Sequence, residues 1–250
     1  MNELTAEFGA EFIGTMILVL LGDGVVANVC LKGTKGNNAG LIVITMGWGL
    51  AVFTAVSITG EVSGAHINPA VTIGLAAASV FSWAKVPLFL AAQFLGGAVG
   101  ALLVWLFYRD HYEMTDDKDT ILATFATGPT VRKPLSNVFS EVVGTFVLIM
   151  AVLYIAVPKF TADGEEVKMG MGALGAIPVA LVVTGIGMSL GGTTGYAINP
   201  ARDLGPRLVH QFVPITHKGP SDWGYSWVPV LGPILGALLA ALAYSLGPVT

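Results

Sequence analysis

Charged side chains are scarce in this sequence. Of its 250 residues only 11% are Asp, Glu, Lys or Arg, whereas 54% are hydrophobic. Soluble domains carry about one quarter charged residues, and a soluble fold this apolar would lack polar surface. The composition therefore excludes an ordinary soluble domain and favours a protein of the lipid bilayer.

Cysteine, histidine and excess basic charge are also lacking. The single cysteine, Cys30, excludes an internal disulfide and a cysteine metal cluster. The four histidines show no metal-ligand spacing and no nucleophile–base arrangement. We therefore expect no metal, no cofactor and no enzymatic activity. A formal net charge of −4 leaves no basic surface for nucleic acid.

Six apolar stretches approach the length of about 20 residues that a bilayer-spanning helix needs. They cover residues 8–30, 40–60, 84–108, 137–158, 173–190 and 227–247. No Lys or Arg precedes the first stretch, so we expect it to be retained and not cleaved as a signal peptide. The polar segments 109–134, 159–170 and 210–223 are predicted to be aqueous loops, the first of them long.

The chain is an internal repeat of two halves. Glu11 to Thr15 matches Glu141 to Thr145 at an offset of 130 residues, and the tripeptide Asn-Pro-Ala recurs at an offset of 131. A glycine pair at helix-packing spacing recurs as well, Gly96/Gly100 and Gly232/Gly236. We predict one membrane domain, residues 1–250, with halves 1–108 and 137–250 joined by the segment 109–136. Three spans per half make the repeat inverted.

The Asn-Pro-Ala copies predict two helices too short to cross the membrane. Asn is a good helix N-cap and Pro suits the first helical position. The apolar runs that follow, 68–79 and 199–210, would each cover about half of the hydrocarbon core. Two such half-helices entering from opposite faces would meet near the midplane. Their glycine-rich approaches are tolerated at that depth only if they line a wet cavity, which predicts a pore. The motif residues are Asn68, Pro69, Ala70, Asn199, Pro200 and Ala201.

The sequences around the two motifs, residues 63–72 and 195–203, closely resemble the signature loops of the major intrinsic protein family, the aquaporins, and the similarity covers essentially the whole chain. Asp203, directly after Asn-Pro-Ala-Arg, is typical of the glycerol facilitators within that family. The resemblance implies an all-α, right-handed bundle of six transmembrane helices plus two re-entrant half-helices. It also implies a homotetramer in the cell membrane with cytoplasmic termini, conducting glycerol, other small neutral solutes and water.

By resemblance, Trp48, Gly187, Tyr196 and Arg202 form the selectivity filter. Arg202 corresponds in the repeat to Val71, so the repeat does not require a charge there, and an intramembrane Arg is usually functional. Glycine at 187, where water-selective relatives typically carry His, is expected to leave the filter open. The hydroxyl of Tyr196, where many glycerol facilitators carry Phe, could shift the preference toward water or another small solute.

The other candidate residues are assigned to the loops that approach the half-helices. Their backbone is expected to line the pore at Gly64, Ala65, His66, Gly195, Tyr196 and Ala197. Glu11 and Glu141 are expected to accept hydrogen bonds from loop N–H groups, the alternative being proton carriers. Asp203 is expected to support Arg202 or the loop. His66 could line the vestibule or simply pack. Asp23, which has no repeat partner, is placed near a membrane interface without an assigned role.

Three alternatives stay open from the sequence. A related channel could prefer water, urea or an undissociated small acid such as lactic acid. A coupled secondary transporter also uses inverted repeats and broken helices. The count of Lys and Arg in the loops favours non-cytoplasmic termini, against the orientation that the resemblance implies.

Overall fold

The computed structural model describes residues 2–156, 158–162 and 165–247. Within them, six helices are long and apolar enough to cross a membrane. They are α1 (Glu3–Cys30), α2 (Leu41–Ser63), α4 (Val86–Phe107), α7 (Pro134–Tyr154), α8 (Ile177–Leu190) and α10 (Val228–Ser245). Short 3-10 helices, η1 (Trp83–Lys85) and η2 (Gly172–Ala176), lead directly into α4 and α8, and with them form the continuous spans Trp83–Phe107 and Gly172–Leu190. The six predicted spans are confirmed.

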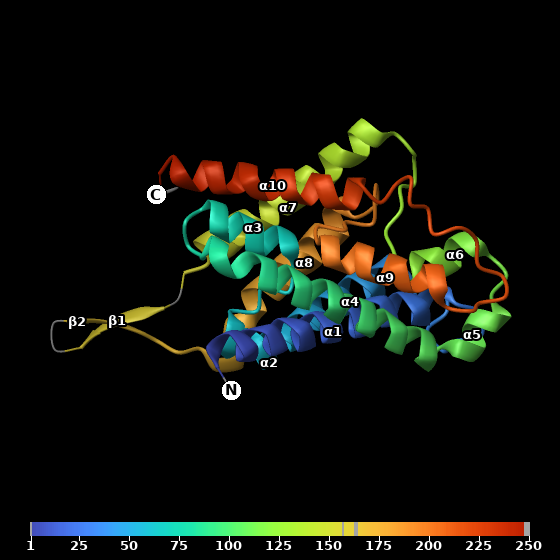
Figure 1. The fold of residues 1–250 in the computed structure, drawn as a ribbon, viewed down its shortest axis with the longest axis horizontal. Helices are drawn as coiled ribbons and strands as arrows, with labels where there is room; N and C mark the ends of the chain where they lie inside the picture. Colours follow the sequence, from blue (N-terminus) through green and yellow to red (C-terminus); the bar gives the residue numbers. More distant parts are fainter. Residues whose placement is uncertain (1, 157, 163–164, 248–250) are drawn as a thin grey trace.

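The two half-helices are present as well. They are α3 (Pro69–Ala77) and α9 (Pro200–Phe212), capped by Asn68 and Asn199 with Pro in the first turn. In the first half α1 packs against α2 and α4, and in the second half α7 packs against α8 and α10. Each half-helix packs mainly against the third span of the other half, α3 against α10 and α9 against α4. The half-helices therefore hold the two halves together (Figure 1).

The recurring glycine pairs allow the helices to approach closely. A Cβ atom at Gly96 or Gly100 would collide with the α1 backbone, at the carbonyls of Phe12 and Met16. In the second half, a Cβ at Gly236 would collide with the carbonyl of Val142 on α7. The packing function predicted from the spacing is confirmed.

The segment between the halves is more ordered than the predicted loop. It contains two short helices, α5 (Arg109–Met114) and α6 (Lys118–Ala123). Tyr112, Ile121 and Phe125 are fully buried beneath them, in a cluster with residues of α1 and α4. The charge-rich composition concealed these anchors, although the acidic run at 116–119 is exposed as expected.

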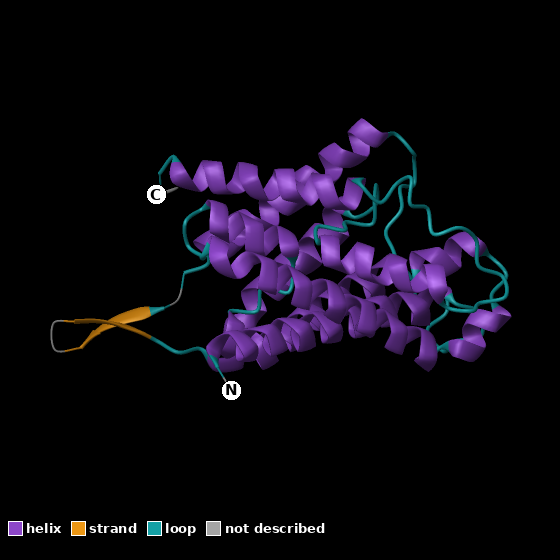
Figure 2. Cartoon of the chain, in the orientation of Figure 1, coloured by secondary structure: helices purple, strands orange, loops and turns teal. Residues whose placement is uncertain are grey.

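The loop after α7 also differs from the prediction. It contains a two-stranded antiparallel hairpin, β1 (Lys159–Ala162) and β2 (Glu165–Lys168), that projects from the helices (Figure 2). The structure is thus mostly helical and not wholly so. The hairpin lies toward the same end of the molecule as the two termini, whereas α5 and α6 lie at the other end (Figure 1).

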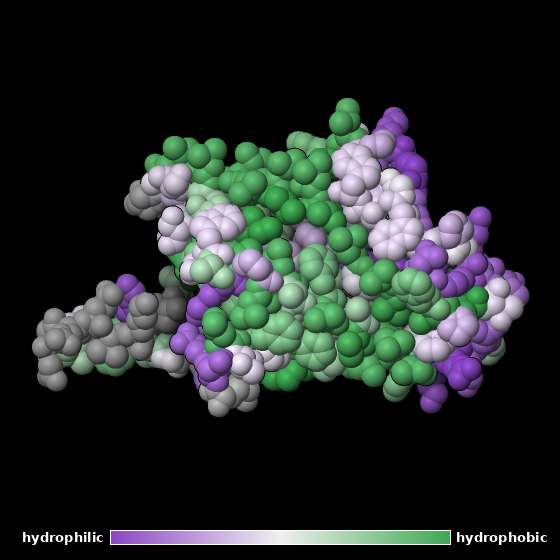
Figure 3. Space-filling view, in the orientation of Figure 1, coloured by the Kyte–Doolittle hydropathy of each residue, from purple (hydrophilic) through white to green (hydrophobic). Residues whose placement is uncertain are grey.

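The surface has the polarity that a bilayer requires. A broad apolar band covers the middle of the molecule, and hydrophilic residues gather toward its ends (Figure 3). Many large apolar side chains of the spanning helices are exposed, among them Ile42, Leu135 and Phe139. An apolar belt of this extent would be unstable against water. Together with the six apolar helices it indicates a multi-pass membrane protein.

Candidate functional site

The two Asn-Pro-Ala motifs are joined to each other by their asparagines. Each side-chain oxygen accepts a hydrogen bond from its own helix, Asn68 Oδ1 from Ala70 N (2.8 Å) and Asn199 Oδ1 from Ala201 N (3.0 Å). Each amide nitrogen donates to the opposite loop, Asn68 Nδ2 to the carbonyl of Ile198 and Asn199 Nδ2 to that of Ile67, both at 2.8 Å. An amide nitrogen has two N–H groups, so each asparagine keeps one donor for a passing molecule.

The loops that lead to the motifs hold an unusual backbone in equivalent positions. Gly64, Ala65 and Ile67 have positive φ angles, and so do Gly195, Tyr196 and Ile198 at the 131-residue offset. Non-glycine residues in this region cost of order 1–3 kcal/mol each and persist only where the surroundings fix them.

The glutamates of the repeat fix these loops. Glu11, fully buried, accepts hydrogen bonds at one oxygen from Ser63 Oγ (2.6 Å) and His66 N (2.9 Å). Its other oxygen accepts from Ile67 N and Gln93 Nε2, both at 2.7 Å.

Glu141 does the same in the second half. Its two oxygens accept from Ala197 N (3.0 Å) and Ile198 N (2.8 Å). Both carboxylates thus satisfy backbone donors that the positive-φ loops leave without helix or sheet partners. Their contacts match the expected structural role, since each carboxylate accepts hydrogen bonds from two backbone N–H groups of its loop.

A cavity of about 210 Å³ runs along these loops. It is lined by residues of both loops, by the two asparagines and by apolar residues of the spanning helices. Of the six loop residues expected at the pore, the cavity lining includes Gly64, Ala65, His66, Tyr196 and Ala197. Gly195 lies beside Thr127 and is not part of the lining. The prolines and alanines of the motifs are buried in the helix starts and set the half-helices in place.

His66 combines the two functions that the sequence left open. It lines the cavity, and its Nδ1 lies 3.1 Å from Thr72 Oγ1 on α3. Its ring also packs edge-on against Phe81, with centroids 4.5 Å apart, and against Phe89. The side chain is therefore held as part of the wall.

Three side chains form the aromatic–arginine cluster of the cavity, which is Trp48 on α2, Tyr196 in the second loop and Arg202 on α9. The guanidinium carbon of Arg202 lies 4.2 Å from the centroid of the Trp48 indole, within the range of a cation–π interaction. Arg202 Nη1 also lies 3.4 Å from Asp23 Oδ1. Asp23, for which the sequence suggested no role, is completely buried beside this arginine.

Gly187 contributes to this cluster in a different way from that predicted. A Cβ at Gly187 would lie 2.8 Å from Tyr196 Cζ and 2.9 Å from Thr45 Cγ2. The space beside the glycine is thus filled by the tyrosine ring and is not left open. The Tyr196 hydroxyl is buried and has no hydrogen-bond partner among the described residues, and the tyrosine is part of the cavity lining.

Asp203 supports a loop and not Arg202. Its carboxylate accepts from Thr127 N (2.8 Å) and Thr127 Oγ1 (2.7 Å), and from Arg207 Nε (2.8 Å) one turn further along α9. Arg207, also fully buried, donates in addition to the carbonyls of Thr127 and Ser221. Arg207 is not among the residues predicted from the sequence, although an arginine four residues after Asp203 on a half-helix is a signal for such a pair.

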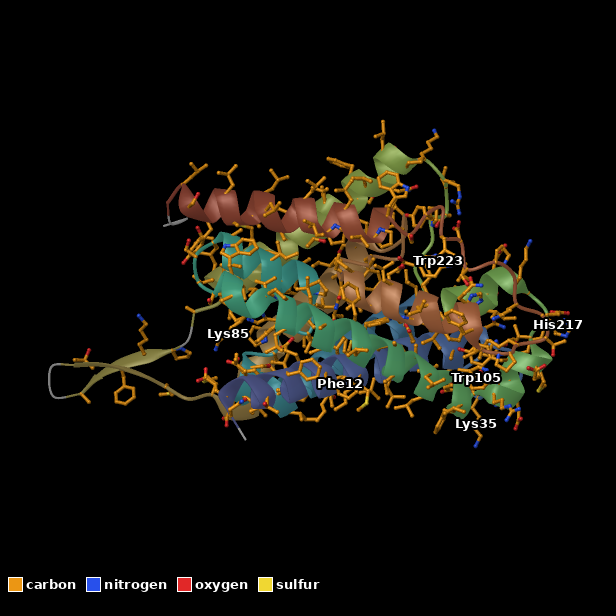
Figure 4. The ribbon with its side chains drawn as sticks, in the orientation of Figure 1. Phe12, Lys35, Lys85, Trp105, His217 and Trp223 are labelled. Carbon is orange, nitrogen blue, oxygen red and sulfur yellow. The ribbon has the colours of Figure 1, made fainter. Side chains whose placement is uncertain are left out.

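Both ends of the molecule carry charged residues outside this site. Figure 4 shows Lys35 and His217 toward one end and Lys85 toward the other. Lys85 pairs with Glu7 at 2.8 Å and with Glu3 at 2.9 Å, both on α1. Glu3 is exposed and Glu7 is buried, and none of the three residues is part of the cavity lining.

Known proteins share this architecture and sequence. Residues 2–244 match the family model described as Major intrinsic protein. A probable glycerol uptake facilitator protein of Thermotoga maritima is 56% identical over 236 residues, covering 94% of this chain and 97% of that protein. The glycerol uptake facilitator protein of Streptococcus pneumoniae is 51% identical over 246 residues, 98% and 99% of the two chains. The crystal structure of the aquaglyceroporin from Plasmodium falciparum matches with a TM-score of 0.81 at 31% identity, over 96% of this chain and 95% of that one. With its paired half-helices and this full-length similarity, the chain belongs to the major intrinsic protein family.

Proposed function

We propose that the protein is a passive transmembrane channel for glycerol and other small uncharged solutes, including water, that excludes ions and protons. One observation carries the proposal: a single cavity contains both the paired asparagines and the aromatic–arginine cluster. The names of the bacterial relatives, which are glycerol uptake facilitators at more than half identity, point to the same substrate.

The aromatic–arginine cluster suits a molecule with a carbon backbone and hydroxyl groups. Trp48 and the Tyr196 ring supply an apolar corner, while Arg202 supplies several fixed hydrogen-bond donors. A polyol can place its carbon atoms against the rings and its hydroxyl oxygens toward the guanidinium. The cluster is therefore the selectivity filter in this proposal, with Gly187 as the support of the Tyr196 ring.

The paired asparagines exclude charge. The N-termini of α3 and α9 meet at the motifs, and each carries the positive end of a helix dipole. Their combined field opposes cations and hydrated protons. A water or hydroxyl at this point accepts from both asparagines, so its own hydrogens point away and the chain of donors that proton transfer needs is interrupted.

A coupled transporter is the less favoured alternative. Coupling needs an ionisable group in the path that binds or releases its ion, and Glu11 and Glu141 are occupied by hydrogen bonds to the loops. In the described part of the chain, no cluster of His, Cys, Asp or Glu could hold a metal ion. A channel of the same fold that prefers water, urea or an undissociated acid such as lactic acid remains the alternative within the channel class.

The same proposal includes a homotetramer in the cell membrane, with cytoplasmic termini. Cross-linking of the purified protein in mild detergent should produce bands up to four subunits, and a band pattern ending at one would contradict the tetramer. For orientation, Lys35→Cys and Glu61→Cys in a Cys30→Ser background place thiols at exposed positions, the first before the start of α2 and the second in its last turn. An impermeant maleimide applied to intact cells should label Cys at 35 and not at 61; the reverse pattern would establish the opposite topology.

Osmotic swelling of proteoliposomes tests the function. Vesicles with the purified protein should re-swell rapidly in a glycerol gradient, while empty vesicles of the same lipid should not. Parallel gradients of urea, dihydroxyacetone and lactic acid at low pH rank the solutes. Water flow without glycerol entry would contradict glycerol as the main solute, and no acceleration of either would contradict the channel.

A further inference from the structure

Arg202 and Asp23 are two buried charges that have no charged counterpart in the other half of the repeat, and they contact each other. At the equivalent positions of the other half the chain has Val71 for Arg202 and Leu153 for Asp23. Arg202 Nη1 and Asp23 Oδ1 lie 3.4 Å apart, although they are 179 residues apart in the sequence. Neither charge is required by the repeat, and the two have opposite signs and are in contact. We therefore treat Arg202 and Asp23 as one functional pair.

Asp23 lies behind the cavity wall and not in it. Its side chain is completely buried and is not part of the cavity lining, whereas Arg202 is. Its second oxygen, Oδ2, has no hydrogen-bond partner in the described residues. A carboxylate in such surroundings is costly unless an opposite charge compensates it. Arg202 is therefore the group that Asp23 serves.

No other carboxylate in the described residues takes this place. Asp203, the next residue on α9, is engaged by Arg207 and Thr127. The four charges thus form two ion pairs, Asp23 with Arg202 and Asp203 with Arg207. Without Asp23 the guanidinium would carry an uncompensated positive charge at the cavity wall.

The turn of α1 around Asp23 also supports the second member of the cluster. A Cβ at Gly22 would collide with the six-membered ring of the Trp48 indole. The guanidinium then lies between this indole, 4.2 Å from its centroid, and the Asp23 carboxylate. One helical turn therefore determines where both Trp48 and Arg202 stand.

We propose that Asp23 is a positioning residue for solute selectivity: it holds the Arg202 guanidinium against α1, beneath Trp48, and keeps it from entering the lumen opposite Tyr196. This inference rests on the proposed glycerol conduction. Removal of the Asp23 charge frees the guanidinium to move toward the centre of the cavity. A narrower passage obstructs glycerol more than the smaller water molecule.

The test compares Asp23→Asn with the wild-type protein and with Glu7→Gln. Glu7 is on the same helix and its carboxylate pairs with Lys85, outside the cavity lining, so it is the matched control. Stopped-flow light scattering on proteoliposomes gives glycerol and water permeability, and their ratio does not depend on the amount of folded protein. We expect Asp23→Asn to lower the ratio by about threefold or more, because residues in direct contact are energetically coupled. Glu7→Gln should leave it unchanged, and Asp23→Glu should restore part of it.

The dependence on Arg202 separates positioning from general packing. In an Arg202→Val background, Asp23→Asn should no longer change the ratio, and it should raise the melting temperature by removing an unpaired buried carboxylate. An unchanged ratio in Asp23→Asn, or an equal fall with and without Arg202, would overturn the proposal. If Asp23→Asn alone does not fold, the double variant Asp23→Asn with Arg202→Val decides. A double variant that folds supports the pairing of Asp23 with Arg202, and a double variant that does not fold overturns the proposal. A wild-type protein that passes no glycerol would contradict the proposed function instead.

Discussion

Gly187→Ala tests the packing of the aromatic–arginine cluster with a single methyl group. The new Cβ would lie 2.8 Å from Tyr196 Cζ, 2.9 Å from Thr45 Cγ2 and 3.0 Å from Tyr196 Oη. Thr45 cannot easily yield, because it is completely buried and its Oγ1 donates to carbonyls of its own helix at 3.0 and 3.1 Å. The Tyr196 ring must therefore move.

The direction and size of the movement follow from the contacts. An ordinary contact of about 3.4 Å or more requires the ring to shift by about 0.6 Å. The ring is bounded on the α8 side by Gly191 as well as Gly187, so the free side is the cavity. Overpacking of this kind costs about 1–3 kcal/mol. If about 1.4 kcal/mol of that appears in the barrier for glycerol, its permeability falls about tenfold.

The assay is the ratio of glycerol to water permeability in proteoliposomes. We expect the ratio to fall by about three- to tenfold in Gly187→Ala, because the smaller water molecule loses less than glycerol in a narrowed passage. Gly185→Ala is the matched control, since it lies on the same helix and a Cβ there meets no atom within 4 Å. An unchanged ratio in Gly187→Ala, or an equal fall in Gly185→Ala, would refute the reasoning.

Three further substitutions test the supports of the site. Glu141→Gln leaves one acceptor oxygen where the carboxylate accepts from two loop N–H groups, so the free energy of unfolding should fall by about 1–3 kcal/mol. The measurement is the melting temperature in detergent, and an unchanged value would contradict the proposal that Glu141 stabilises the loop. Asn199→Asp keeps the acceptor that caps α9 but replaces the donor to the Ile67 carbonyl with a carboxylate oxygen, so the fluxes of water and glycerol should both fall. Undiminished fluxes would show that the hydrogen bond between the two motifs is dispensable. Arg207→Lys removes the two-pronged contact with the Asp203 carboxylate and should speed proteolysis of the segment 124–133 in the folded protein. An unchanged cleavage rate would contradict the inference that Arg207 and Asp203 hold this segment in place.

The architecture could be predicted from the sequence because two of its signals are local and do not depend on how the helices pack. Apolar length indicated the six spans, and the Asn-Pro start indicated the two half-helices. The repeat then required the two motifs to meet, as the hydrogen bonds from Asn68 and Asn199 show. The glutamates could also be assigned, because loops at that depth need acceptors for their N–H groups.

The sequence did not predict contacts between segments that the repeat does not relate. Asp23 and Arg202 are far apart in the chain and have no counterparts in the other half, so nothing in the pattern connected them. The same holds for Gly187, whose effect depends on where the Tyr196 ring lies. The buried anchors of the segment 109–136 were concealed because a few apolar residues, such as Tyr112, lie among charges.

The measurement that tests the central claim most directly is the uptake of radiolabelled glycerol into proteoliposomes at equilibrium and against time. Passive conduction predicts that glycerol enters far faster than in empty vesicles and stops at the outside concentration. That end point should be the same with no ion gradient, with an imposed proton gradient and with an imposed sodium gradient. Accumulation above the outside concentration under either gradient, or entry no faster than in empty vesicles, would contradict the account.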